Sequence, residues 1–115
     1  MAKCVGLLYP CSVKKSFKIP KYVTLGAHRI KIKYVKNLHK KKSAVGMAYF
    51  NENEIWIQAN TKQFPSAPSQ QKQWYYHELF HHMLFLSGFH KLNEDEDFVD
   101  LISQYQTQAS ETEEY

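Results

Sequence analysis

Acidic residues are missing from the first half of the chain. No Asp or Glu precedes Glu52, whereas twelve Lys and Arg residues do, and after Lys91 there are eight acidic residues and no basic one. A basic half can contact nucleic acid, and Lys31, Lys33 and Lys40–Lys42 are the candidates for this. No recognised nucleic-acid-binding motif accompanies these lysines. We therefore favour a solvated, basic strand surface opposite an acidic helical half.

Cysteine is scarce as well. Cys4 and Cys11 are the only two, and six residues separate them. This spacing matches no common two-cysteine zinc knuckle, and the chain has no second pair to complete such a site. Because an intracellular chain usually keeps its thiols reduced, we expect ordinary packing or loop cysteines.

Long hydrophobic runs are also absent. The N-terminus lacks the apolar segment of a signal peptide, and the most apolar stretch, Leu79–Phe89, is too short to span a bilayer. We therefore expect a soluble, cytoplasmic protein with no membrane partner. Its 115 residues suffice for one domain with a single modest core.

Short segments of alternating polar and apolar residues predict a small sheet in the first half. The expected strands are Tyr22–Leu25, His28–Val35, Val45–Phe50 and Glu54–Ala59, with an irregular lead-in over residues 1–21 and an exposed loop over residues 36–43. In the second of these strands, Ile30, Ile32 and Tyr34 share one face, and three basic side chains share the other. This alternation is typical of a half-buried strand.

A long helix is predicted after the strands. It is expected to begin at Ser69 or Gln70, with Ser66 or Ser69 as the N-cap, and to end at Ser87 before Gly88. Its first turns are polar, and the remainder is apolar nearly all round. A helix of that composition is normally buried.

A second, acidic helix is expected over Glu94–Gln106, with Asn93 as its N-cap. The polar tail over residues 107–115 is expected to fray. Strands followed by helices indicate an α+β domain over residues 22–106 with a three- to four-stranded, mainly antiparallel sheet.

The long helix carries the chemistry, because His77, Glu78 and His81 form an HExxH motif. Residues four apart lie on one face of a helix. Two imidazoles so placed can bind one zinc ion, each through a ring nitrogen about 2 Å from the metal. Glu78 then lies beside the metal, where a carboxylate can accept a proton from metal-activated water.

A catalytic zinc ion usually has a third protein ligand. The downstream candidates are His82, His90, Glu94, Glu96 and Asp100. His82 points about 100° away from His81 on the helix, so it cannot complete the same site. A metzincin would have glycine and histidine where this chain has Leu84 and Ser87, which excludes that class.

Glu96 and Asp100 are the strongest pair among these candidates, because they are four residues apart on one helical face. Glu96 is the expected ligand. Asp100 can accept the other N–H of a ligating imidazole and so fix its orientation. Glu94 lies about 160° round the helix from Glu96. Glu94 and His90 remain alternatives for the third ligand.

Strands, then an HExxH helix, then a helix with Glu96 and Asp100 form an order that resembles the gluzincin-type zinc metallopeptidases. The similarity is greatest to very small members: minigluzincins, ImmA/IrrE-like peptidases and short phage-encoded zinc-peptidase-like proteins. It covers residues 22–105. The resemblance implies a minimal zincin fold.

This resemblance also implies a set of roles. Zinc would be held by His77, His81 and Glu96, with Glu78 as the general base. The strand Val45–Phe50 would bind an extended peptide by strand addition.

The resulting hypothesis is hydrolysis of a peptide bond in a peptide or protein substrate. His90, Tyr105 and Tyr76 are candidates for contacts with the substrate or the transition state. One alternative is a non-catalytic, zinc-stabilised adaptor that binds a partner protein. The other is a basic nucleic-acid-binding module.

Overall fold

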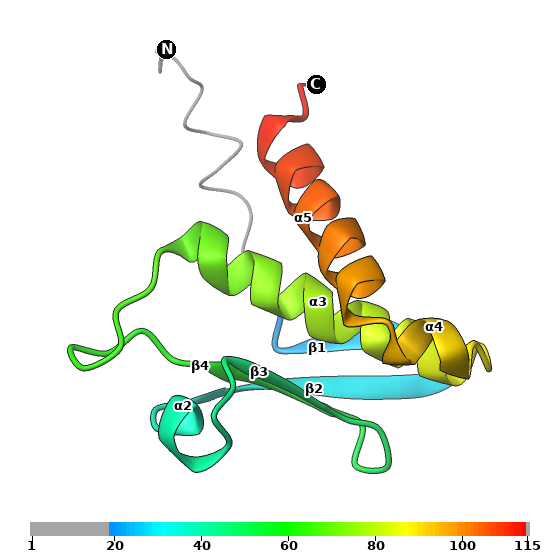
Figure 1. Cartoon of the computed structure of the whole chain (residues 1–115), viewed down its shortest axis with the longest axis horizontal. Helices are drawn as coiled ribbons and strands as arrows, with labels where there is room; N and C mark the ends of the chain where they lie inside the picture. The colour runs from blue at the N-terminus through cyan, green and yellow to red at the C-terminus, as the bar shows by residue number, and fades with distance from the viewer. Residues whose placement is uncertain (1–18, 115) are drawn as a thin grey trace.

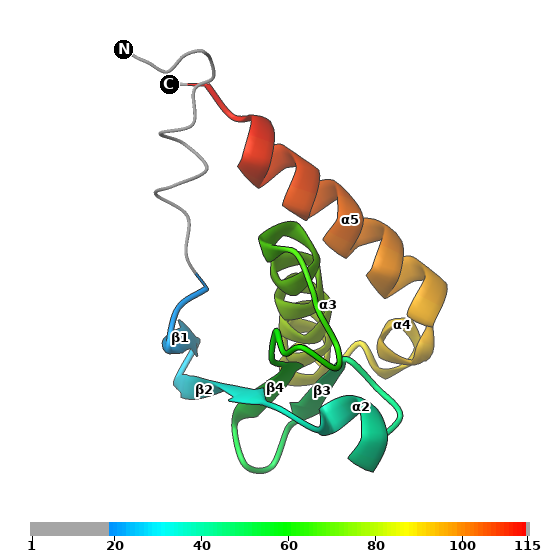
Figure 2. The same ribbon diagram turned by 90° about the vertical axis from the view of Figure 1, so that its left-hand side faces the viewer.

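The computed structural model describes residues 19–114 and has the expected α+β composition. Its elements are β1 (Tyr22–Leu25), β2 (His28–Val35), α2 (Leu38–Lys41), β3 (Gly46–Tyr49), β4 (Glu54–Gln58), α3 (Pro68–Leu86), α4 (His90–Glu94) and α5 (Glu96–Thr112). Cys4, Cys11 and nearly all of the predicted lead-in lie outside the described residues. Helices α3 and α5 lie on one side of the sheet, and α2 lies on the other (Figures 1 and 2).

The four strands form one mixed sheet in the order β1-β2-β4-β3. The pairs β1–β2 and β3–β4 are antiparallel, whereas β2–β4 is parallel. The sheet is therefore mixed: its two outer pairs have the expected antiparallel arrangement, and its central pair does not. The hairpin β3–β4 joins β2 through its second strand, so β4 runs in the direction of β2 and β3 becomes an edge.

The core is a layer of isoleucines on the face of the sheet that α3 covers. Ile30, Ile32, Ile55 and Ile57 are all buried there, together with Tyr75 of α3. Ile32 and Ile55 are paired across β2 and β4. The alternation seen in the sequence therefore reports the core face correctly, because residues two apart in a strand point the same way.

A short helix, α2, replaces part of the predicted loop between β2 and β3. Its Leu38 is fully buried, and its His39 donates a backbone N–H to Oε1 of Gln58 at 2.8 Å. Gln58 is itself fully buried and donates to the Lys36 carbonyl at 2.7 Å. Because buried polar groups require such partners, Gln58 fastens α2 to the end of the sheet.

Helix α3 begins and ends close to the expected positions. Its N-cap is Ala67 rather than Ser66 or Ser69, and the Ala67 N–H donates to the side chain of Gln70 at 2.8 Å. At the other end Gly88 adopts a φ of 81°, which glycine tolerates. Backbone hydrogen bonds there close a Schellman motif, and the helix ends before Gly88, as the sequence predicted.

The second predicted helix is divided and longer than expected. Asn93 lies inside the short helix α4, and Asp95 is the N-cap of α5, where its side chain accepts from the Phe98 N–H at 3.0 Å. Helix α5 continues to Thr112, so it includes the first six residues of the predicted tail, 107–112. Thr107 is buried, and Glu111 lies 3.4 Å from the buried Lys72 of α3. No described helix is long and apolar enough to span a membrane.

The pair between Lys72 and Glu111 gives a test of this longer α5. Glu111 also accepts from the Ser69 hydroxyl at 2.6 Å. Glu111→Gln is expected to lower the free energy of unfolding by about 1–3 kcal/mol, because the change removes the charge that faces a buried ammonium. The matched change Glu114→Gln, at an exposed position, should have almost no effect. Equal urea midpoints for the two variants would contradict the packing of α5 on α3.

Candidate metal centre

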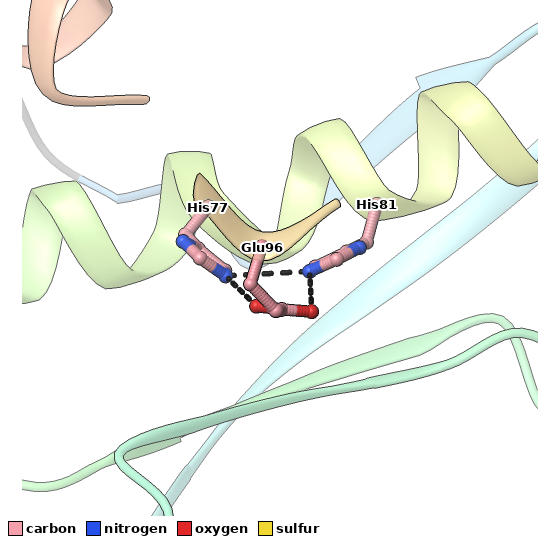
Figure 3. Close-up of side chains that lie close together, drawn as sticks. All are labelled: His77, His81 and Glu96. Atoms are coloured by element: carbon pink, nitrogen blue, oxygen red, sulfur yellow. Dashed lines mark hydrogen bonds and ion pairs between the residues drawn. The ribbon is translucent and has the colours of Figure 1, made fainter. Parts of the chain in front are cut away.

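Two histidines of α3 and one glutamate of α5 converge on a single point (Figure 3). His77 Nε2 lies 3.1 Å from Glu96 Oε1, and His81 Nε2 lies 3.2 Å from Glu96 Oε2. The two Nε2 atoms are 3.3 Å apart. His77, His81 and Glu96 therefore form a group that could hold a metal ion.

The outer nitrogens of both imidazoles face oxygen atoms. His77 Nδ1 lies 3.5 Å from a carboxylate oxygen of Asp100, and His81 Nδ1 lies 2.6 Å from the side-chain oxygen of Asn93. Because an oxygen acceptor at Nδ1 favours a hydrogen there, both Nε2 atoms present their lone pairs to the common point.

The spacing of the three donor groups suits a tetrahedral ion. Bonds of about 2.0–2.1 Å in tetrahedral geometry separate ligand atoms by about 3.3–3.4 Å. The two Nε2 atoms are 3.3 Å apart, and each lies 3.1–3.2 Å from a different carboxylate oxygen of Glu96, which is close to that value. The side chains of His77 and His81 are 18% and 10% exposed, whereas that of Glu96 is 68% exposed. Glu96 therefore closes the centre from the solvent side.

Glu78 is buried between α3 and the edge strand β3. A methyl group added at Gly46 would lie 2.8 Å from its Oε2, which is closer than such atoms pack. Burial, together with the negative charge of Glu96, raises the pKa of Glu78 to about 8. Glycine at position 46 therefore makes room for a carboxyl group that is held away from water.

A cleft of about 450 Å³ adjoins these residues and is open to solvent. It is lined by Gly46, Met47, Ala48, Phe50, His77, Glu78, His81, Asn93, Glu94 and Glu96. Its floor includes β3, the edge strand of the sheet. The cleft thus brings together the group that could hold a metal ion, a buried carboxyl group and an edge of the sheet formed by the described strands.

The other residues singled out from the sequence lie outside the three-residue group. Glu94 lines the cleft but is not part of the group, and His90 lies at the start of α4 with its ring 5.9 Å from that of Phe85. Tyr105 is 63% exposed on α5. Tyr76 packs its ring 5.2 Å from that of Tyr75. None of His90, Tyr76 and Tyr105 is among the residues lining the cleft.

His82 has a separate, structural place, as its position on the helix predicted. It is 1% exposed, and its Nε2–H donates to the Glu54 carbonyl at 3.0 Å. Burial lowers the pKa of His82, so the neutral ring is favoured. The hydrogen bond ties α3 to β4.

Sequence reasoning missed two residues of the site, Asn93 and Gly46. Asn93 was interpreted as an N-cap, although its spacing of twelve residues from His81 leaves room for a loop that returns to the helix. Gly46 begins a predicted strand and carries no local signal of its role. Both contacts arise from the tertiary packing of α3.

Comparison with known proteins gives no relative for this chain. No protein-family model, no curated protein and no solved structure matches it. The interpretation of the site therefore depends on the arrangement of its residues.

The raised pKa of Glu78 predicts a pH dependence of stability in protein freed of metal by a chelator. The unfolded carboxyl loses its proton near pH 4.5, whereas the folded one keeps it to about pH 8. The folded state thus binds more protons in this range, so stability falls as pH rises, by at most about 1.4 kcal/mol per pH unit. Urea unfolding at pH 5 and pH 7.5 measures this loss.

Glu78→Gln is the control, because the amide fits the same space without titrating. The variant should lose less stability than the wild type between the two pH values. An identical loss in both proteins would show that Glu78 does not carry the effect.

Proposed function

We propose that the protein is a zinc-dependent peptidase of minimal gluzincin type, with His77, His81 and Glu96 as the metal ligands. The observation that carries the proposal is the convergence of two imidazole nitrogens and one carboxylate at 3.1–3.3 Å. Three electron-pair donors at that distance repel one another unless a cation lies among them. The centre is therefore best explained as a cation site.

Zinc is the ion that this donor set favours. Calcium and magnesium prefer all-oxygen sites, whereas imidazole nitrogens suit zinc and its transition-metal neighbours. Two histidines and one glutamate, with the remaining position open, are typical of catalytic rather than structural zinc. The cleft beside Glu96 leaves room on that open side for water and substrate.

Glu78 is the proposed general base. When bound, zinc lowers the pKa of water toward about 7 and polarises a carbonyl oxygen. The Glu78 carboxylate accepts the proton of the attacking water and transfers it to the leaving amine as the C–N bond breaks. A nearby dication opposes the effect of burial on the pKa of Glu78, which favours the ionised base.

Peptide is the proposed substrate class because the cleft runs along an unpaired strand edge. Residues Gly46, Met47 and Ala48 of β3 line it, and among the strands of residues 19–114 β3 pairs with β4 alone. An extended peptide can add to such an edge through main-chain hydrogen bonds. This addition would hold a peptide carbonyl beside Glu78 without requiring a particular side chain.

The ligand assignment predicts the zinc content of four variants. Wild-type protein should retain one zinc ion per chain after dialysis. In His77→Ala and Glu96→Ala the zinc affinity should fall by more than about 100-fold, which is more than the loss expected when a residue that only hydrogen-bonds to a ligand is removed. His90→Ala and Glu94→Ala are the matched controls and should retain zinc. Elemental analysis gives the content directly. Retention by Glu96→Ala, or loss in His90→Ala, would reject Glu96 as the third ligand.

The role of Glu78 predicts a separation of zinc binding from turnover. Glu78→Gln should keep its zinc but hydrolyse a quenched-fluorescent peptide library about 10²–10⁴-fold more slowly, because the base is lost. Glu94→Gln, which changes another carboxylate of the cleft, should remain active. A chelator should abolish cleavage by the wild type.

Two outcomes would count against peptidase activity. Cleavage by Glu78→Gln at the wild-type rate would reject the base. Full zinc content with no cleavage of any library member would favour the adaptor that the same fold could form.

A further inference from the structure

The face of the sheet opposite α3 is basic. Alternation along β2 points Arg29, Lys31 and Lys33 away from the buried Ile30 and Ile32. Among the described helices, only α2 lies on this side of the sheet (Figure 1). We call this surface, formed by the outward side chains of the four strands, the outer sheet face.

Aromatic rings are interleaved with these cations. Tyr22 is 44% exposed, and the Arg29 guanidinium lies 4.0 Å from the centre of its ring. Tyr22 is paired with Lys31 across β1 and β2. Trp56 is paired with Lys33, whose ammonium lies 5.4 Å from the Trp56 ring. Cation and ring therefore alternate over a sheet surface.

The charge of the outer sheet face is nearly all positive. Glu54 is the only acidic residue in the four strands. Its carboxylate is already engaged, because it accepts from Trp56 Nε1 at 2.8 Å and lies 3.4 Å from Lys33 Nζ. These contacts lower the pKa of Glu54. Lys31 is paired with the same Glu54 across β2 and β4, so this one carboxylate faces two lysines, whereas Arg29 lies over the Tyr22 ring.

Helix α2 extends the basic surface beyond the end of β2. It begins at Leu38, three residues after Val35, and carries Lys40 and Lys41, with Lys42 as its C-cap, all exposed. The buried Gln58 holds α2 on this side through its hydrogen bond with His39. Exposed basic residues therefore continue along the chain from β2 into α2.

The acidic residues near the end of the chain lie on the other side of the molecule. Those beyond Lys91 belong to α4, α5 and the residues that flank them, and α5 packs on α3 rather than on the strands (Figure 2). The charge asymmetry of the sequence is therefore an asymmetry of the fold. A polyanion is attracted to one face and repelled by the other.

We propose that the outer sheet face binds single-stranded nucleic acid. Lysine and arginine neutralise phosphates, and aromatic rings on a sheet stack on unpaired bases, which a duplex keeps in its interior. Basic side chains that alternate with aromatic ones can contact the charged backbone and the flat bases of a single nucleic-acid strand at the same time. His77 and His81 lie on the opposite side of the sheet, so this binding does not depend on the metal centre.

The test uses the full chain and a fluorescein-labelled oligothymidine of twenty nucleotides, followed by anisotropy at several salt concentrations. Binding should weaken steeply as salt rises. Lys31→Glu, and the triple change of Lys40, Lys41 and Lys42 to Glu, should each weaken binding about tenfold or more at low salt. Lys91→Glu makes the same charge change on α4 and should alter it less than about twofold.

A second readout locates the bound strand on the sheet. The chain has two tryptophans, Trp56 and Trp74, so Trp74→Phe leaves Trp56 as the reporter. Its fluorescence should be quenched by the unlabelled oligonucleotide at the concentration that raises the anisotropy. Zinc content and far-UV circular dichroism of each variant should match the wild type. A loss of oligonucleotide binding can then be distinguished from a loss of metal binding or of the fold.

Several results would overturn the proposal. These are no binding at low salt, equal weakening by Lys31→Glu and Lys91→Glu, and tighter binding of an equivalent duplex. Binding to vesicles of anionic phospholipid in the absence of oligonucleotide binding would assign the surface to a membrane instead.

Discussion

The rotation of α3 about its own axis, which decides the side that faces the sheet, is the constraint on which the rest of the structure depends. Tyr75 and His82 are seven residues apart and so lie on one side of the helix, where both contact the sheet. With that side fixed, the turn of about 100° per residue directs His77 and His81 toward the start of α5 and leaves Glu78 over β3. If α3 were rotated differently about its axis, His77 and His81 would be buried or Glu78 would be exposed.

The features that could be predicted from sequence are those that depend on the spacing of residues within a single strand or helix. Alternation in residues 28–35 predicted the bounds of β2, because one face of that strand is buried, and a short β-prone run predicted those of β1. The HExxH spacing placed His77 and His81 on one helical face, and the spacing of Glu96 from Asp100 indicated a second such face. The two faces meet, with Glu96 beside both histidines. The roles of these residues in catalysis stay predictions.

The features that could not be predicted depend on contacts between distant segments. The parallel pairing of β2 with β4 follows from where a hairpin docks. The helix α2 is held by Gln58, nineteen residues beyond His39, and the extension of α5 to Thr112 is stabilised by Lys72 on another helix. Gly46 and Asn93 matter only because α3 lies over β3 and beside α4. No pattern within a window of the sequence carries that information.

The central claim is that His77, His81 and Glu96 bind one zinc ion with only nitrogen and oxygen ligands. X-ray absorption at the zinc edge of the zinc-loaded full chain tests it most directly. The account predicts nitrogen and oxygen scatterers at about 2.0–2.2 Å, with the outer-shell signal of two imidazoles. A sulfur scatterer at about 2.3 Å, or the signal of a single imidazole, would contradict it.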